Sequence, residues 1–144
     1  MSEQVLRQQQ SVLTFSPRGR GMTDITREVA TLLADSGIAD GMVHLFVQHT
    51  SCSLLIQENA DPDVQHDLER FLSRMVPDGD PLFEHTAEGP DDMPAHVRAA
   101  LTATSLSIPV ASGRLLLGTW QGIYLYEHRV HRTERRIVIS ICGA

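Results

Sequence analysis

The sequence lacks the features that mark several large classes of protein. Its 144 residues hold two cysteines, no basic block interleaved with aromatic residues, and no apolar run long enough to cross a bilayer. A net charge of −6 without such a block argues against a nucleic-acid partner. No basic segment followed by an apolar one begins the chain, so we expect no membrane partner and a cytoplasmic location.

The two cysteines, Cys52 and Cys142, lie in segments that look like buried structure. Without a secretory context, a single pair of cysteines indicates reduced thiols more than a disulfide. We therefore expect each to be a small buried apolar residue.

Composition indicates one domain that spans residues 1–144. Hydrophobic residues make up 42% of the chain and charged residues 21%, a balance that can form a core at this length. No internal repeat, low-complexity tract or linker divides the sequence.

Periodicity and capping residues predict the elements of this domain. A mix of apolar and polar residues without helical period predicts a strand at 5–15. Further strands are predicted at 42–48, which is apolar on both faces, and at 53–57, 105–110, 114–118 and 136–142. A first helix is predicted with Thr23 or Asp24 as its N-cap and Gly37 as its end. A second is predicted over 62–75 with Asp61 as N-cap, and a third over 95–103 with Asp92 as N-cap. In the second helix, His66, Asp67, Glu69 and Arg70 should face solvent. The order of elements favours an α+β domain built on a two-layer sheet.

The stretch from His85 to His96 is the most unusual in the chain. It packs three carboxylates, two imidazoles and two prolines into a dozen residues. Carboxylates this close repel one another unless a cation, hydrogen bonds or water offset the repulsion. A stiff loop rich in oxygen and nitrogen ligands suits a divalent metal ion. A capped helix behind an acidic surface loop is the alternative that these residues leave open.

Two further polar clusters follow predicted strands. His49-Thr50-Ser51 comes directly after the strand at 42–48, where a rigid scaffold would expose a site. A core histidine beside two hydroxyls that bond the backbone is the alternative. Glu127-His128-Arg129 repeats this arrangement at a later strand end.

The segment from Gly118 to Gly122 predicts a tight bend between strands. Two glycines bracket Thr119, Trp120 and Gln121, so backbone or a ligand can approach closely there. Packing of Trp120, the only tryptophan, into the core is the alternative. Further along the chain, arginines from Arg129 to Arg136 could hold a phosphate or simply balance charge.

Four motifs in this order resemble the YjbQ-like family, also called the secondary thiamine-phosphate synthase enzyme family. They are His49-Thr50-Ser51, Glu58-Asn59-Ala60-Asp61-Pro62, the stretch from Glu88 to His96, and Gly118-Thr119-Trp120-Gln121-Gly122-Ile123 with Glu127-His128-Arg129 after it. The resemblance covers nearly the whole chain. It implies a single YjbQ-like domain over 1–144: a two-layer β-sandwich with flanking helices, assembled as a homotrimer with a site near the subunit interface.

The family name implies a transferase that joins a pyrimidine pyrophosphate to a thiazole phosphate. The sequence departs from the family at Cys52, where alanine is usual, and a cysteine that lines the site would bring thiol sensitivity. Otherwise Cys52 is a small buried residue.

These residues together predict a divalent-metal site for zinc, magnesium or manganese. We expect His85, His96 and His128 to bind the metal, and His49, Glu88, Asp91 and Asp92 to take part in catalysis. The residues expected to bind a small phosphorylated substrate are Thr50, Ser51, Asn59, Thr119, Gln121, Arg129 and Arg136. Two alternatives remain open: a metal-dependent hydrolase that uses the same ligands to activate water, and a non-catalytic trimer that binds a metal or a phosphorylated metabolite.

Overall fold

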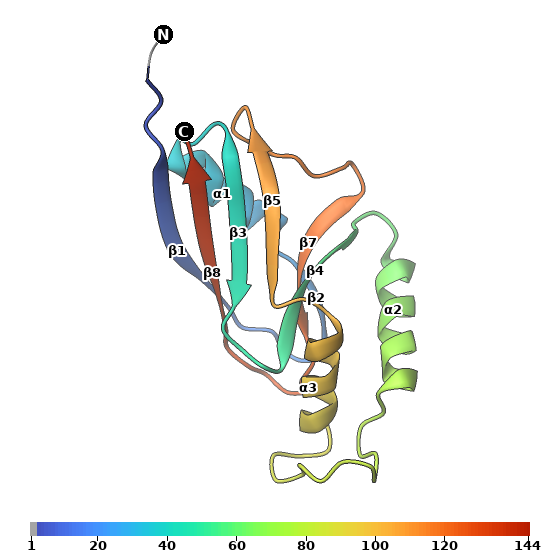
Figure 1. Cartoon of the computed structure of the whole chain (residues 1–144). Coiled ribbons are helices and arrows are strands. Elements are labelled where there is room, and N and C mark those ends of the chain that lie inside the picture. The colour runs from blue at the N-terminus through green and yellow to red at the C-terminus, as the bar shows by residue number, and fades with distance from the viewer. Residues whose placement is uncertain (1–2) are drawn as a thin grey trace.

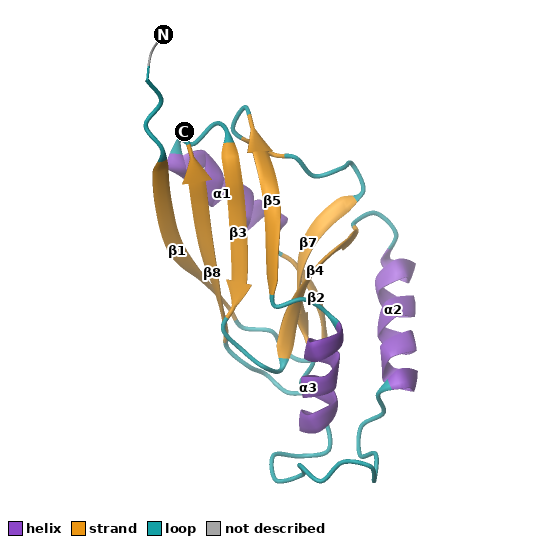
Figure 2. Ribbon diagram, in the orientation of Figure 1, coloured by secondary structure: helices purple, strands orange, loops and turns teal. Residues whose placement is uncertain are grey.

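A computed structural model describes residues 3–144 of the chain (Figures 1 and 2). The strands are β1 (Arg7–Phe15), β2 (Gly21–Asp24), β3 (Gly41–Val47), β4 (Cys52–Glu58), β5 (Ser105–Ala111), β6 (Arg114–Leu115), β7 (Gln121–Glu127) and β8 (Arg135–Gly143). The helices are α1 (Thr26–Ser36), α2 (Pro62–Met75) and α3 (Asp92–Leu101). Among the described residues, no helix is both long and apolar enough to span a membrane.

The strands form two antiparallel sheets, ordered β1-β8-β3-β5-β6 and β2-β7-β4. The α+β class predicted from the sequence is therefore confirmed. The predicted strand at 136–142 is β8, which lies inside the larger sheet between β1 and β3. The two sheets are tied together just after α3, because Leu54 of β4 bonds the carbonyl of Ala103 and Val47 of β3 bonds that of Thr104.

One apolar core fills the space between the sheets and α1. Helix α1 contributes Val29 and Leu33, which lie with Leu45 of β3, Leu54 of β4 and Ile139 of β8. Figure 1 shows α1 on one face of the five-stranded sheet, whereas no helix lies over the face turned to the viewer. Only one face of β3 is buried, and His44 and Phe46 are exposed, so the prediction of a strand apolar on both faces was wrong.

The helix ends follow local capping chemistry. The Asp61 carboxylate accepts a hydrogen bond from the Asp63 amide at 2.9 Å, and Pro62 opens α2, both as predicted. Gly37 ends α1 in the left-handed conformation, φ 70°. Helix α3 begins earlier than predicted: Asp91, not Asp92, is the residue before the helix, and Asp92 is its first residue. The reason is that the Asp91 carbonyl accepts the first helical hydrogen bond, from the Ala95 amide. Strand β2 was missed, since its four residues carry no alternating pattern.

Helix α2 has no fully buried side chain and is fixed to the molecule by polar contacts. Glu69 accepts hydrogen bonds from Arg98 of α3 at 2.8 Å and from the Tyr126 hydroxyl of β7 at 2.7 Å. Arg98 is completely buried. The prediction that Glu69 faces solvent was therefore wrong, because it is the partner that a buried arginine requires.

A second buried ion pair fixes the loop between β7 and β8. Glu127 is fully buried, and its carboxylate accepts hydrogen bonds from Arg135 at 2.6 and 2.7 Å, from the Thr133 hydroxyl, and from the amides of His128 and Arg129. Burial alone would raise the pKa of Glu127, but the bonds from Arg135 and Thr133 outweigh it and the pKa is lowered. The pair therefore stabilises the fold at neutral pH.

We expect Glu127→Gln to lower the free energy of unfolding by about 3 kcal/mol, because it leaves a buried arginine without its countercharge. Urea denaturation at pH 7 measures this loss. Glu134→Gln, the same change at an exposed position in the same loop, is the control and should shift stability by less than about 0.5 kcal/mol. Because the folded-state pKa of Glu127 is depressed, the wild-type advantage should shrink as the pH falls below about 4.5. A difference that stays constant down to pH 3 would contradict this account.

Candidate functional site

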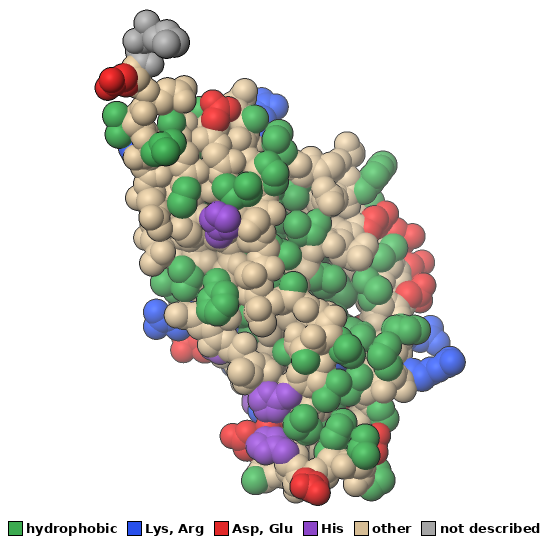
Figure 3. Space-filling view, in the orientation of Figure 1, with side chains coloured by type: hydrophobic (Ala, Val, Ile, Leu, Met, Phe, Trp, Pro, Cys, Tyr) green, Lys and Arg blue, Asp and Glu red, His purple; other side chains and the backbone are tan. Residues whose placement is uncertain are grey.

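The candidate site lies at the end of the molecule where α3 begins. There the β3–β4 turn, the β7–β8 loop and the segment from 76 to 91 come together around the first turns of α3. Figure 3 shows histidine and acidic side chains gathered at this end. The four residues with ligand atoms within 4.8 Å of one another are His85, Glu88, Asp92 and His96, which we name the histidine–carboxylate cluster.

Asp92 is the centre of this cluster. Its Oδ2 lies 2.7 Å from His85 Nε2 and 3.2 Å from His96 Nε2, and Glu88 Oε2 lies 3.6 Å from His85 Nε2. The spacing of four residues between Asp92 and His96 puts both on one face of α3. Ligand atoms of a tetrahedral zinc ion, bound at about 2.0 to 2.1 Å, are separated by about 3.3 Å. The separations in the cluster, 2.7 to 3.6 Å, lie on both sides of this value, so its residues could hold one divalent ion after a small widening of the His85–Asp92 contact.

The orientation of His96 adds independent support for a cation. Its Nδ1 lies 2.9 Å from the carbonyl oxygen of Thr50, which can only accept, so Nδ1 must donate. In a neutral imidazole, Nε2 then carries a lone pair and faces the Asp92 carboxylate, another acceptor. Such a pair requires a proton or a metal ion between its atoms. A backbone carbonyl that fixes the tautomer in this way is the usual outer partner of a metal-binding histidine.

Asp91, one of the four predicted catalytic residues, holds the loop instead of facing the cluster. One of its oxygens accepts from Arg129 Nε at 2.9 Å and from the Val130 amide at 3.0 Å. Arg129 also donates to Asp92 Oδ1 at 2.7 Å and to the Glu88 carbonyl at 2.8 Å. Each of the three guanidinium nitrogens thereby donates one hydrogen bond. We correct both assignments: Asp91 and Arg129 position the cluster and are not placed to act on a substrate.

Arg129 also contributes to the charge of the site. Burial alone would raise the pKa of Asp92, but hydrogen bonding to His85 and Glu88, and after these the Arg129 charge, outweigh it and lower the pKa. The pKa of Asp91 is lowered in the same way, against burial, by its bonds to Arg129 and Val130. Both carboxylates are therefore ionised at neutral pH, the form that a metal requires of Asp92.

The strand-end motif His49-Thr50-Ser51 lies beside α3, and its three residues have different roles. Thr50 supplies the carbonyl that orients His96. Ser51 accepts hydrogen bonds from Arg135 and so belongs to the buried ion pair of the β7–β8 loop. His49 Nε2 accepts the backbone amide of Arg136 at 2.8 Å. His49 is not a member of the histidine–carboxylate cluster, but it lines a cavity together with His96.

The prediction that His128 binds the metal was wrong. Its side chain is fully buried, its Nε2 shares a hydrogen bond with Ser53 at 2.8 Å, and its ring lies 4.4 Å from that of Tyr126. Burial lowers the pKa of His128 to about 3, so it is neutral. It is a core histidine, the alternative that the sequence had left open for His49.

Three predicted substrate-binding residues lie at the far end of the smaller sheet. Glu58 and Gln121 are paired across β4 and β7, whereas Cys52 is paired with Glu127 at the other end. Six residue steps along these strands separate the two ends by about 20 Å. Asn59 bonds the Thr119 carbonyl, and the Gln121 side chain bonds the Gly118 amide, so these residues shape a turn. Trp120 is 63% exposed there, which excludes the alternative of core packing.

The sequence missed two features that build the site. The Thr50 carbonyl carries no side-chain signal, so its role in orienting His96 could not be predicted. The pairing of Glu127 with Arg135 was also missed, although a carboxylate at a strand end with an arginine eight residues later is a signal for it. Cys52 and Cys142 are free, as expected, but only Cys52 is buried, so the prediction of burial was wrong for the half-buried Cys142. Burial raises the pKa of Cys52 to about 12. Thiol sensitivity at Cys52 is thereby excluded.

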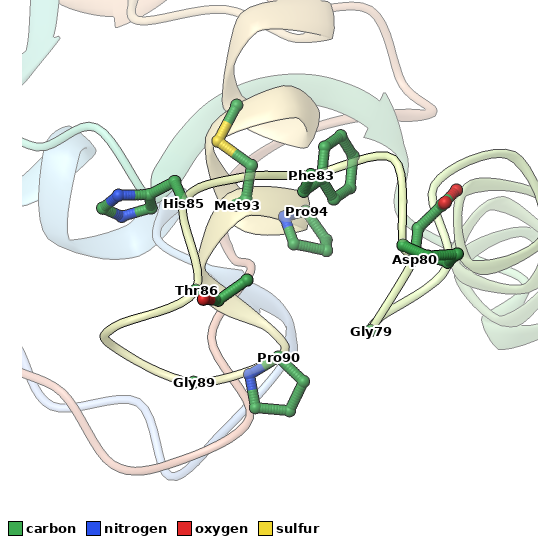
Figure 4. A pocket seen from close by; sticks show the side chains of 10 residues that line it. Gly79, Asp80, Phe83, His85, Thr86, Gly89, Pro90, Met93 and Pro94 are labelled. Atoms are coloured by element: carbon green, nitrogen blue, oxygen red, sulfur yellow. The ribbon is translucent and has the colours of Figure 1, made fainter.

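Two cavities reach the cluster at different histidines. One, of about 300 Å³, has His85 at one end and Asp80 at the other, with Phe83, Met93 and Pro94 between them (Figure 4). The other, of about 330 Å³, is lined by His96, His49 and residues of the later turns of α3. The side chain of His85 is 47% exposed, whereas that of Asp92 is only 3% exposed. The cluster therefore has one side open to solvent, at His85, and one side buried, at Asp92. A divalent ion held here would have an open side for water or substrate.

Comparison with known proteins supports one family. The sequence profile described as UPF0047 protein YjbQ-like matches residues 11–144. The chain is 48% identical to the UPF0047 protein YjbQ of Escherichia coli O157:H7, over 93% of this chain and 97% of that protein. It is 44% identical to a UPF0047 protein of Synechocystis, over 99% and 97%.

Solved structures show the same fold. A YbjQ-like protein from Sulfolobus solfataricus superposes with a TM-score of 0.88 at 26% identity, covering 97% of this chain and all of that one. A conserved hypothetical protein from Thermus thermophilus gives a TM-score of 0.80 at 35% identity, covering 90% and 97%. The chain therefore belongs to the UPF0047, YjbQ-like family.

Proposed function

We propose that the histidine–carboxylate cluster binds a divalent metal ion and that the protein is a metal-dependent enzyme acting on small phosphorylated molecules. The observation that carries the proposal is His96, whose Nδ1 donates to Thr50 and whose Nε2 faces the ionised Asp92. Two imidazoles with carboxylates favour zinc, since magnesium and manganese prefer all-oxygen sites. Asp92, His85 and His96 would be the ligands, with Glu88 at the exposed side.

The chemistry that such an ion supplies is polarisation of a phosphoryl oxygen and activation of a bound water or hydroxyl group. The chain contributes fixed ligands, because Arg129 and Thr50 hold Asp92 and His96 in place. Glu88 is 64% exposed and is the carboxylate free to accept a proton at the open side. Arg136 is exposed and makes no ion pair within residues 3–144, so it is available to an anionic group.

Between the two enzyme reactions, the two cavities favour transfer over hydrolysis. A transferase needs two substrates at one metal, and the cavities reach the cluster at His85 and at His96 separately. The joining of a pyrimidine pyrophosphate to a thiazole phosphate, which the family resemblance implies, is the specific form of this proposal. A hydrolase would need one cavity and the open coordination position alone.

We further propose that the protein assembles as a homotrimer. Large apolar side chains are exposed on α2, where Phe71 is 62% and Met75 51% accessible. Exposed apolar surface of this kind marks contacts between subunits.

The metal proposal predicts that His96→Ala lowers zinc affinity by about 100-fold or more, because it removes a ligand and not only an outer partner. The folded protein should persist, since alanine is the best helix former and Asp91 still precedes the helix. Elemental analysis after dialysis against dilute zinc measures this. His66→Ala, on the exposed face of α2, is the control and should keep full zinc content. Equal zinc in the wild type and His96→Ala would refute the site.

The transferase proposal predicts release of pyrophosphate by the metal-loaded protein only when both the pyrimidine pyrophosphate and the thiazole phosphate are present. A coupled assay for pyrophosphate measures this. Release from the pyrimidine pyrophosphate alone would show a hydrolase. Zinc binding without release under any condition would leave a metal-binding protein.

The assembly proposal predicts one species with three times the mass of the 15.9 kDa chain in light scattering at micromolar concentration. The exposed apolar side chains should be covered in such a trimer, so dilution should not produce monomers readily. A single monomeric species would contradict it.

A further inference from the structure

The cavity at His96 continues away from the histidine–carboxylate cluster along α3 as a groove. Two adjoining hollows of about 330 and 360 Å³ share His49, Thr50 and Thr104 in their walls. The first reaches His96 and the second reaches Phe46. We name the two together the α3 groove. Each hollow falls in the size range of small-molecule sites, which begins at about 300 Å³.

The walls of the α3 groove are mostly apolar and carry no acidic side chain. Ala99, Ala100 and Thr104 form the side toward α3, and Phe46 and Val47 form the side toward β3. The cluster at its end is acidic, so the two surfaces suit different parts of one molecule. A metal-bound anionic group at His96 would place an apolar body between α3 and the β3–β4 turn.

His49 presents a directed hydrogen-bond donor in this groove. Its Nε2 accepts the Arg136 amide, so the proton of a neutral imidazole must lie on Nδ1. Burial and the charges of Arg135 and Arg136 lower the pKa of His49, which favours that neutral form. Within residues 3–144, Nδ1 has no hydrogen-bond partner, and His49 lines both hollows. Donors without a partner in a cavity fix the orientation of a ligand.

We propose that the α3 groove binds the apolar body of the substrate, while the metal holds its anionic group and His49 Nδ1 donates to an acceptor on the body. This inference rests on the proposed function and names its substrate class: a small phosphate-type anion attached to a single ring that carries an acceptor atom. The positive charge of Arg136 beside His49 disfavours a cationic body.

The first test compares phenylphosphonate with methylphosphonate on zinc-loaded protein by calorimetry. The phenyl ring should make binding at least tenfold tighter, because only it reaches the groove. Ala100→Leu fills the groove from an exposed helix position and should abolish this preference while zinc content stays the same. Ala30→Leu, at an exposed position of α1, is the matched control and should keep it. Equal affinity of the two phosphonates for the wild type overturns the proposal.

The second test addresses His49 with the three pyridylphosphonate isomers, whose ring nitrogen is an acceptor. At least one isomer should bind the wild type threefold or more tightly than phenylphosphonate. His49→Gln keeps an acceptor for the Arg136 amide but removes the Nδ1 donor, so it should lose this gain. His49→Asn keeps a donor near the position of Nδ1 and should retain it. The same loss in both variants, or no gain with any isomer, overturns the role of His49.

The outcomes separate this inference from the metal site. If the protein takes up no zinc, the proposed function is contradicted. Binding in the α3 groove is then tested separately, by amide chemical shifts of the zinc-free protein. Without zinc, millimolar phenylphosphonate should still shift the amides of residues 46–50 and 99–104, and methylphosphonate should not. Shifts confined to residues 79–94 would overturn the proposal. A lower assembly mass of Ala100→Leu would also overturn it, because the groove would then hold a second copy of the chain.

Discussion

The site depends on one nearly buried carboxylate, that of Asp92, whose two oxygens have different partners. Oδ1 accepts from Arg129, and Oδ2 faces both His85 and His96. A carboxylate so little exposed is tolerated only when it is paired and hydrogen-bonded. Arg129 meets that requirement on one side and leaves Oδ2 available for a ligand on the other. Because Arg129 holds Oδ1, the negative charge of Asp92 is kept and its Oδ2 faces the two histidines.

The position of Arg129 depends in turn on the fold beneath it. The Glu127 carboxylate receives the amides of His128 and Arg129, so the chain turns sharply at the end of β7 and directs Arg129 toward Asp91 and Asp92. Arg135 neutralises Glu127 and also bonds Ser51, beside Thr50. One buried ion pair therefore sets the loop that holds Asp92 and the turn whose carbonyl orients His96. Loops that carry function are commonly fixed to a rigid sheet in this way.

Sequence reasoning succeeded where the determining interactions are local. Asp61 and Pro62 define the start of α2 within three residues, and the members of the histidine–carboxylate cluster all lie between His85 and His96. It failed where register or burial decides. His128 follows a strand end just as His49 follows another, yet His128 faces the core and His49 a groove. Gln121 and Glu127 mark opposite ends of β7, a strand whose bounds were not predicted from the sequence, so their separation was missed.

The way the acidic loop is held bears on what a metal would do there. A structural zinc site is closed by four protein ligands, and the fold depends on the ion. Here the Arg129 guanidinium already bonds Asp91, Asp92 and the Glu88 carbonyl, and the Asp92 ligand atom is fixed without any ion. His85 and Glu88 lie on the exposed side of the cluster and would not enclose a bound ion. An ion in this place would add little to the fold and would keep an open side, which supports the proposed catalytic role over a structural one.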